Sequence, residues 1–289
     1  MTGPISSAAN PLVKRMRRLA DRRYRRRERA FVVEGIQPVW RAVEAGWEIE
    51  ELIISPELLS ASGRASQMVA AQESRGVRVA RFTDELFARL SDRDGPAGLA
   101  AIVRGGLAGL QDLVVRPGSA FAALHRIGNP GNLGTIIRTA DAVGGDGVIL
   151  IGDCIDPFAP AAVKASMGSL FSVDVANAGD SGEFFDWAAA KGVQVVATSG
   201  RAETEHWSGG YRPPLAVLLG SEGAGLPEDM MARADLRIRI PMSGTAESLN
   251  VAVAAGVMLF EVRRRVVSRG AAASAARPHK RQSQPRWLR

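Results

Sequence analysis

Residues 125–150 read HRIGNPGNLGTIIRTADAVGGDGVIL, residues 215–230 read LAVLLGSEGAGLPEDM, and residues 238–261 read IRIPMSGTAESLNVAVAAGVMLFE. Each stretch joins an apolar run typical of a buried strand to a glycine-rich turn and then to a helical run. Glycine has no Cβ, so it is favoured where the chain passes close to itself or to a ligand. The pattern predicts a site built mainly from backbone, with few polar side chains: Asn132, Arg138, Glu222, Ser248 and Asn250.

The chain around these stretches alternates short apolar runs with helical runs. Strands are predicted at 121–125, 147–151, 171–176, 193–198, 215–220 and 236–240. Helices are predicted at 132–143, 159–169, 181–191, 227–234 and 248–266. Strands that are apolar throughout, without alternation, are typical of a parallel sheet that is covered on both faces. The second half is therefore predicted to be an α/β domain.

The first hundred residues form a second, smaller alternating pattern. Helices are predicted at 10–28, 36–46, 64–75 and 83–90, and strands at 31–35, 51–55, 77–82 and 99–103. This alternation predicts a separate α/β domain. We expect a domain over 1–106, a linker over 107–118, a domain over 119–268 and a basic tail over 269–289 that is disordered until bound.

The composition of the 289-residue chain is that of a globular protein, with 46% hydrophobic and 23% charged residues. Its single cysteine, Cys154, cannot form an internal disulfide, which fits a reducing compartment. The N-terminal sequence lacks the apolar core of a signal peptide, and no apolar run is long enough to span a membrane. A cytoplasmic protein without membrane association is expected.

Positive charge is concentrated in two segments. Residues 14–29 hold ten Lys/Arg and two acids, and residues 262–289 hold nine Lys/Arg and no acid. Because the net charge of the whole chain is only +7, the chain between these segments is acidic. Basic arms on an acidic body favour a polyanionic partner, and nucleic acid is the favoured one. The alternative is that both arms are simply solvated charge.

Each motif also has a structural interpretation when it is taken alone. Arg138 lies on an apolar helical run and could be bound to a structural carboxylate. Glu222 could be a helix-terminal charge or a solvated turn residue, and Ser248 could be an N-cap with Asn250 in the first turn. The G-x-G turn lacks the remainder of a dinucleotide fingerprint. The three histidines and Cys154 lack the spacing of metal ligands, so no metal is expected.

Taken in order, the motifs N-x-G-x-x-x-R-T-A-D-A (132–142), L-G-S-E-G-x-G-L (219–226) and I-P-M-x-G-x-x-E-S-L-N-V-A-x-A (240–254) resemble those of the SpoU-type 2′-O-ribose RNA methyltransferases of the SPOUT superfamily. The stretch VKASMGSLF (163–171) fits the same family. Residues 5–103, with FVVEG near their start, resemble its L30e-like RNA substrate-binding domain. The resemblance implies a trefoil-knotted parallel-sheet domain that works as a homodimer.

The resemblance also implies S-adenosylmethionine as cofactor and RNA, most directly ribosomal RNA, as substrate. The implied catalytic residues are Asn132, Arg138, Glu222, Ser248 and Asn250. The implied cofactor-binding residues are Leu219, Gly220, Glu222, Gly223, Ile240, Pro241, Met242, Ser248, Leu249 and Asn250. From the charge pattern and the motif, RNA contacts are expected at Arg15, Arg17, Arg18, Arg22, Arg23, Arg25, Arg26 and Arg138.

The implied reaction moves a methyl group from a sulfonium to a ribose 2′-hydroxyl. Arg138 is the proposed general base in the family, but guanidinium groups stay protonated at neutral pH. Our hypothesis is therefore that Arg138 orients the acceptor and stabilises its developing negative charge. The alternatives are a transfer-RNA methyltransferase, a non-catalytic RNA-binding protein on the same fold, and a nicotinamide dehydrogenase, which would need a ribose-binding acid that is missing.

Overall fold

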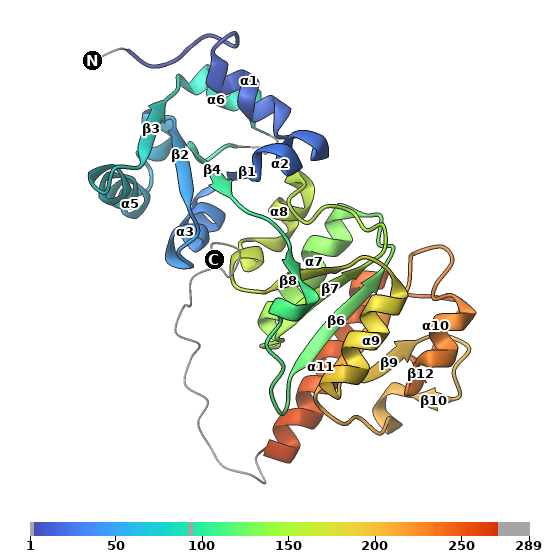
Figure 1. Ribbon diagram of the computed structural model, residues 1–289. Helices are drawn as coiled ribbons and strands as arrows, with labels where there is room; N and C mark the ends of the chain where they lie inside the picture. Colours follow the sequence, from blue (N-terminus) through green and yellow to red (C-terminus); the bar gives the residue numbers. More distant parts are fainter. Residues whose placement is uncertain (1–2, 92–94, 271–289) are drawn as a thin grey trace. The chain divides into compact units, whose positions relative to one another are not determined.

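The computed structural model describes residues 3–91 and 95–270 and divides into two compact units. The first unit contains the chain up to Gly106 together with Phe158–Ser172. The second contains Leu107–Pro157 and residues 173–270. Both units mix helices with one sheet each, which confirms the predicted α/β class (Figure 1).

The first unit is built on a four-stranded mixed sheet in the order β1-β4-β2-β3. β4 pairs antiparallel with both β1 and β2, and β2 pairs parallel with β3. The strands are β1 (Ala30–Glu34), β2 (Ile49–Ile54), β3 (Arg78–Arg81) and β4 (Leu99–Arg104). The helices are α1 (Pro11–Arg18), α2 (Arg22–Glu28), α3 (Ile36–Glu44), α4 (Pro56–Leu59), α5 (Gly63–Ser74) and α6 (Asp84–Leu90).

The predicted basic helix over 10–28 is two helices, which corrects that prediction. α1 ends at the cap residue Leu19, and Asp21 caps α2 by accepting a hydrogen bond from the Arg23 backbone N–H at 2.7 Å. Arg25 is only 5% exposed, and its Nη1 donates to the carbonyl oxygens of Leu19 (2.9 Å) and Ala20 (2.6 Å). A buried guanidinium therefore stabilises the turn by satisfying carbonyls that the end of a helix leaves without partners.

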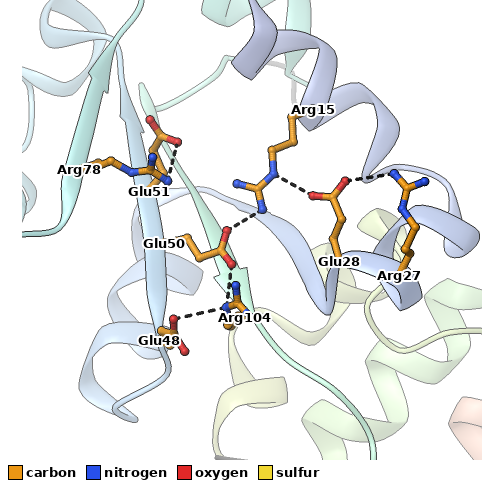
Figure 2. Close-up of polar contacts among 8 residues, drawn as sticks. All are labelled: Arg15, Arg27, Glu28, Glu48, Glu50, Glu51, Arg78 and Arg104. Carbon is orange, nitrogen blue, oxygen red and sulfur yellow. Dashed lines mark hydrogen bonds and ion pairs between the residues drawn. The ribbon is translucent and has the colours of Figure 1, made fainter.

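Ion pairs fasten α1 and α2 to the sheet. Arg15 lies between Glu28 and Glu50, at 2.8 and 2.6 Å (Figure 2). Glu50 also pairs with Arg104 on β4 at 2.8 Å, and its side chain is only 10% exposed. Burial alone would lower the pKa of Arg15, but the hydrogen bonds to Glu28 and Glu50 outweigh it and raise the pKa above its ordinary value. The network fixes where the exposed arginines of both helices lie.

Residues 158–172 contribute to the core of the first unit, although they lie inside the span predicted for the second domain. They contain α8 (Pro160–Ser166) and the 3₁₀ helix η2 (Ser169–Phe171). The Phe158 and Phe171 rings lie 4.6 and 6.2 Å from the Phe31 ring of β1, and the Phe171 ring is 5.2 Å from Trp47. Local periodicity could not predict this long-range packing.

The second unit has an eight-stranded sheet in the order β10-β12-β9-β11-β6-β7-β8-β5. All of its strand pairs are parallel, as predicted from the apolar runs. The strands are β5 (Ala108–Gly109), β6 (Ala120–His125), β7 (Gly147–Ile151), β8 (Val175–Ala178), β9 (Gln194–Thr198), β10 (Thr204–Glu205), β11 (Leu215–Leu219) and β12 (Leu236–Arg239).

Helices cover both faces of this sheet. α7 (Pro130–Ala142) and α11 (Val251–Gly270) pack against each other and against the central strand β6. α9 (Ser181–Lys191) and α10 (Glu228–Arg233) contribute Phe184, Trp187 and Met230 to an apolar core with the inner residues of the strands (Figure 1). The carboxyl ends of β6, β11 and β12 lead into the three glycine-rich motifs.

Several boundaries differ from the prediction. β8 begins at Val175 and not at 171, because Ser169–Phe171 forms a 3₁₀ helix. The predicted linker over 107–118 contains β5, which extends the large sheet by pairing with β8, and the short helix η1 (Leu110–Asp112). β10 was not predicted, because two residues carry no periodicity. The predicted tail over 269–289 lies outside the described residues, apart from the end of α11.

Within residues 3–91 and 95–270, no helix is long and apolar enough to cross a membrane.

Candidate active site

The first motif places Asn132 in the first turn of α7. Asn129 caps this helix by accepting a hydrogen bond from the Asn132 backbone N–H at 3.1 Å, and Pro130 occupies the first helical position. Proline fits there because its missing N–H would have no helical partner. The cap therefore sets where the Asn132 side chain lies, at the carboxyl end of β6.

The second motif folds back on itself between β11 and α10. Ser221 and Gly225 exchange backbone hydrogen bonds of 3.2 and 3.1 Å. A Cβ on Gly220 would lie 2.1 Å from the carbonyl carbon of Gly225, so only glycine fits at this position. The turn exposes Glu222 and Gly223. Glu222 lies six residues before α10 begins, so it is not the helix-terminal charge that the sequence left as an alternative.

Asn250 closes the site from the third motif. Its Nδ2 donates to Asn132 Oδ1 at 3.0 Å, and Asn132 Nδ2 donates in turn to Glu222 Oε1 at 2.9 Å. The chain of hydrogen bonds joins three loops that are far apart in sequence. Three of the five predicted catalytic residues are thereby brought into direct contact.

Asn250 also corrects the predicted start of the last helix. α11 begins at Val251, and Asn250 Oδ1 accepts hydrogen bonds from the backbone N–H of Ala252 (2.8 Å) and Val253 (3.4 Å). Asn250, not Ser248, is therefore the N-cap. Ser248 is exposed and has no hydrogen-bond partner among the residues that the structure describes.

Glu222 is held as a carboxylate. Burial alone would raise its pKa, but hydrogen bonds from Asn132 and from the backbone N–H groups of Glu222, Gly128 and Asn129 outweigh it and lower the pKa below the ordinary value. An ionised carboxylate only accepts hydrogen bonds, which fixes the orientation of the Asn132 amide. The asparagine then presents its carbonyl oxygen to Asn250.

Arg138 lies on the exposed side of α7, two turns after the helix starts. Neither an ion pair nor a hydrogen bond to its guanidinium is present within the described chain. The structural alternative of an arginine bound to a carboxylate therefore does not apply within that part. An exposed guanidinium is available to an anionic or polar ligand.

The remaining predicted cofactor residues lie along the carboxyl edge of the sheet. Leu219 ends β11 and is buried, whereas Ile240 and Pro241 are half-buried. Residues 242–250 are all exposed, including the apolar side chains of Met242 (38%) and Leu249 (37%). This segment therefore presents both apolar and polar side chains at its surface.

The predicted RNA-binding arginines of the first unit divide into two groups. Arg17, Arg18, Arg22, Arg23 and Arg26 are exposed on α1 and α2. Arg25 is buried and Arg15 is bound to two glutamates, so the structure gives these two a role in holding the helices. This placement departs from the prediction, because sequence alone does not distinguish an arginine that faces the core.

Sequence reasoning left out other exposed cations in the same arm. Lys14, Arg27 and Arg29 are exposed, and the guanidinium of Arg27 lies 4.8 Å from the centre of the Tyr24 ring. The Arg18 guanidinium lies 5.9 Å from the same ring. Membership in the basic run over 14–29 was the signal that could have identified them.

His125 ends β6 and was set aside as a metal ligand. It is 9% exposed, and its Nδ1 is buried without a hydrogen-bond partner among the described atoms. Burial and the positive charge of Arg126 lower its pKa, and Asp229 opposes them in part, so the imidazole is neutral at pH 7. No cluster of three His, Cys, Asp or Glu that could bind a metal occurs within the described chain.

Comparison with known proteins gives matches to both units. Residues 119–260 match the SpoU rRNA methylase family, and residues 10–101 match the MRM3-like substrate binding domain. A 23S rRNA (uridine(2479)-2′-O)-methyltransferase of Streptomyces viridochromogenes is 33% identical over 262 residues, covering 88% of this chain and 89% of that protein.

Solved structures agree with these matches. An AdoMet-bound rRNA methyltransferase from Sinorhizobium meliloti has a TM-score of 0.83 at 38% identity, covering 91% of this chain and 98% of that one. The SpoU methyltransferase AviRb from Streptomyces viridochromogenes, in complex with AdoMet, has a TM-score of 0.80 at 30% identity, covering 90% and 99%.

Proposed function

The chain belongs to the SpoU rRNA methylase family, and on that premise we propose that it transfers a methyl group from S-adenosylmethionine to a ribose 2′-hydroxyl of ribosomal RNA. The observation that carries the proposal is the hydrogen-bonded chain Asn250–Asn132–Glu222, which joins the three motif loops into one site. The relatives that match over most of their length include 23S rRNA 2′-O-methyltransferases.

The residues at the carboxyl edge fit S-adenosylmethionine. The loop at Gly220 has no space for a Cβ, and the segment 242–250 is exposed along its whole length. Backbone groups of these loops would hold the polar parts of the cofactor, with Met242 and Leu249 against its apolar parts. When bound, S-adenosylmethionine supplies an electrophilic methyl group on a sulfonium.

Arg138 would act on the acceptor. Its guanidinium is exposed and has no protein partner within the described chain, so it can bind the ribose or an adjacent phosphate. A fixed positive charge beside the attacking hydroxyl stabilises the negative charge that develops on its oxygen. Arg138 remains protonated throughout, because a guanidinium does not lose its proton at neutral pH.

The Asn250–Asn132–Glu222 chain would hold the three loops in fixed relative positions for this reaction. Alignment of the acceptor with the methyl donor lowers the activation barrier, by on the order of 7–11 kcal/mol when the groups are well oriented. Because the Glu222 carboxylate is held ionised, the direction of the amide hydrogen bonds is fixed. The chain thus acts by positioning.

The exposed arginines of α1 and α2 would bind RNA phosphates. Arg17, Arg18, Arg23 and Arg26 are exposed on two short helices that ion pairs fasten to the first unit. Residues 10–101 match a substrate-binding domain, which supports the same role. A ribose 2′-hydroxyl as acceptor requires RNA.

A homodimer is the form that we propose. Val253 and Phe260 on α11 are 52% and 57% exposed, and they lie seven residues apart on one face of the helix. An apolar stripe of this kind is typical of a protein–protein interface.

The trefoil knot and the cytoplasmic location are also proposals. In the sheet, β9 separates β12 from β11 and β6. α11 follows β12 in the chain but packs on β6 and β11, which is compatible with a threaded chain. Ribosomal RNA as substrate and a single cysteine favour the cytoplasm.

The test combines cofactor binding with mapping of the modified nucleotide. Calorimetry should detect S-adenosylmethionine binding by the purified chain, and 2′-O-methyl mapping should find a ribosomal RNA site that is lost when the gene is deleted. If the 2′-O-methyl mark were lost only from transfer RNA, the substrate would instead be transfer RNA. Failure to bind S-adenosylmethionine would favour a non-catalytic RNA-binding protein.

A further inference from the structure

Trp207 is an exposed tryptophan on the second unit, with 49% of its surface accessible. It lies on the 3₁₀ helix η3 (His206–Ser208), directly after β10 at one edge of the eight-stranded sheet. Tryptophan is strongly buried on average, so an exposed indole in an ordered element indicates a contact surface. None of the three motifs includes it.

The backbone around Trp207 is held from two sides. Tyr211, itself 1% exposed, donates its hydroxyl hydrogen to the His206 carbonyl oxygen at 2.5 Å. Arg265 on α11 donates a hydrogen bond to the Trp207 carbonyl oxygen. The His206 ring lies 4.6 Å from the Trp207 ring and supports it. An indole held in this way would lose little conformational freedom when a ligand stacks on it.

Two arginines of α11 share one glutamate beside this support. Glu261 binds Arg264 through both carboxylate oxygens at 2.8 Å and Arg265 at 2.7 Å, so one carboxylate fixes two guanidinium groups. The side chains of Arg264 and Arg265 are 58% and 34% exposed. These two arginines and one glutamate together carry one net positive charge beside the support of the indole.

We propose that Trp207, with Arg264 and Arg265, forms a second RNA-binding surface that takes an unpaired nucleotide of the substrate. The base stacks on the indole, and the neighbouring phosphates lie against the two arginines. Aromatic side chains with adjacent positive charge bind single-stranded RNA in this way, whereas a duplex hides the faces of its bases. The inference rests on the proposed function, because it assumes an RNA substrate.

A second copy of the chain is a less suitable occupant. At ~100° per residue, Arg265 lies about 140° around α11 from Phe260 and about 120° from Val253. Arg265, which holds the Trp207 backbone, is therefore on a different side of the helix from the exposed apolar stripe of Val253 and Phe260. Arg264 lies about 40° around the helix from Phe260, between the stripe and Arg265.

The experiment measures binding of a labelled 12-nucleotide oligouridine and of a blunt RNA duplex of equal length to the full chain by fluorescence anisotropy. Trp207→Ala should weaken oligouridine binding about tenfold, as expected for one lost stacking contact, and should change duplex binding less than twofold. Trp207→Phe should recover most of the affinity, because a phenyl ring still stacks. Leu107→Ala is the matched control, since Leu107 is 38% exposed next to β5 at the opposite edge of the sheet.

Two further measurements keep the outcomes distinct. Oligouridine should quench tryptophan fluorescence in the unmodified chain and less in Trp207→Phe. Unchanged oligouridine affinity of Trp207→Ala would overturn the inference, and so would a change in its sedimenting mass, which would assign the indole to a second copy. If the unmodified chain failed to methylate RNA while Trp207→Ala still lost oligouridine binding, the proposed function would fall and the RNA surface would stand.

Discussion

The chemistry of the site depends on a few side chains whose partners the structure defines. Asn132 is the central one, because its amide donates to Glu222 and accepts from Asn250. Arg138 differs from these three in having no partner within the described chain. Arg138 is thus separate from the hydrogen-bonded chain, and the proposed function gives the two different roles.

Arg138→Ala should lower methyl transfer by about 10²–10³-fold, because a donor that stabilises developing negative charge is lost. Cofactor affinity should change little, since Arg138 lies on α7 and not in the loops of the second and third motifs. Single-turnover transfer to ribosomal RNA and calorimetry with S-adenosylmethionine measure the two effects. Near-normal turnover of Arg138→Ala would contradict the role, and Thr135→Ala, also exposed on α7, is the control.

Glu222→Gln should flatten the acid dependence of stability. The folded state holds the Glu222 pKa below its ordinary value of 4.5, so the carboxylate adds stability above that value and loses it as pH falls through the folded pKa. Urea unfolding between about pH 3 and pH 7 should show a smaller fall for the glutamine variant. Glu247→Gln, at an exposed residue of the third motif, is the matched control. Equal acid slopes for both variants would refute the prediction.

Sequence predicted which polar residues belong to the site but not how they pair. Asn132 and Glu222 are 90 residues apart, and Asn132 and Asn250 are 118 apart. Their contact follows from the order of parallel strands, which periodicity does not reveal. The assignment of the N-cap failed for a local reason, because Ser248 and Asn250 are both good caps and only the backbone decides between them.

At the scale of elements, the basic arm contains a helix boundary that its charge pattern does not reveal. Charge and spacing predicted a single helix over 10–28, whereas Asp21 caps α2 and Arg25 turns inward to two carbonyl oxygens between the helices. Most other elements were predicted within a few residues, because long apolar or amphipathic runs dominate them. The start of β8 was shifted, because a 3₁₀ turn precedes it, and β10 was missed, because a two-residue strand has no repeating pattern.

Arg25→Ala should destabilise the first unit by about 1–3 kcal/mol, because it leaves two carbonyl oxygens near the core without their donor. Arg23→Ala, an exposed neighbour on the same helix, should stay within about 0.5 kcal/mol of the unmodified chain. In RNA binding, Arg23→Ala should reduce the salt slope by about one. Denaturant unfolding and titrations at several salt concentrations measure these effects. Equal stability of the two variants would remove the structural role of Arg25.

At the scale of the whole molecule, the stripe on α11 bears on assembly. Phe260→Asp places a charge in the proposed interface and should shift the chain from dimer to monomer at micromolar concentration. The fold should change by less than about 0.5 kcal/mol, since Phe260 is 57% exposed. Analytical ultracentrifugation measures the mass, with Leu107→Asp as the control. A dimer that persists in Phe260→Asp would place the interface elsewhere.

The segment 158–172 bears on the integrity of the first unit. Phe171→Ala should destabilise that unit by about 3–5 kcal/mol, because Phe171 is 6% exposed and packs on Phe31 and Trp47. Hydrogen exchange should show faster exchange in β1 and β4. Phe184→Ala, in the core of the second unit, should instead affect β8 and β9. The opposite pattern would contradict the assignment of the segment.

The same segment limits how the protein can be re-engineered. Because the chain enters the first unit a second time at Phe158 and leaves it after Ser172, that unit is not a detachable N-terminal cassette. A chimera that exchanged only residues 1–106 for those of a relative would join a foreign sheet to a native aromatic segment. A chimera designed to bind a new RNA must therefore exchange two segments, the N-terminal sequence and residues 158–172.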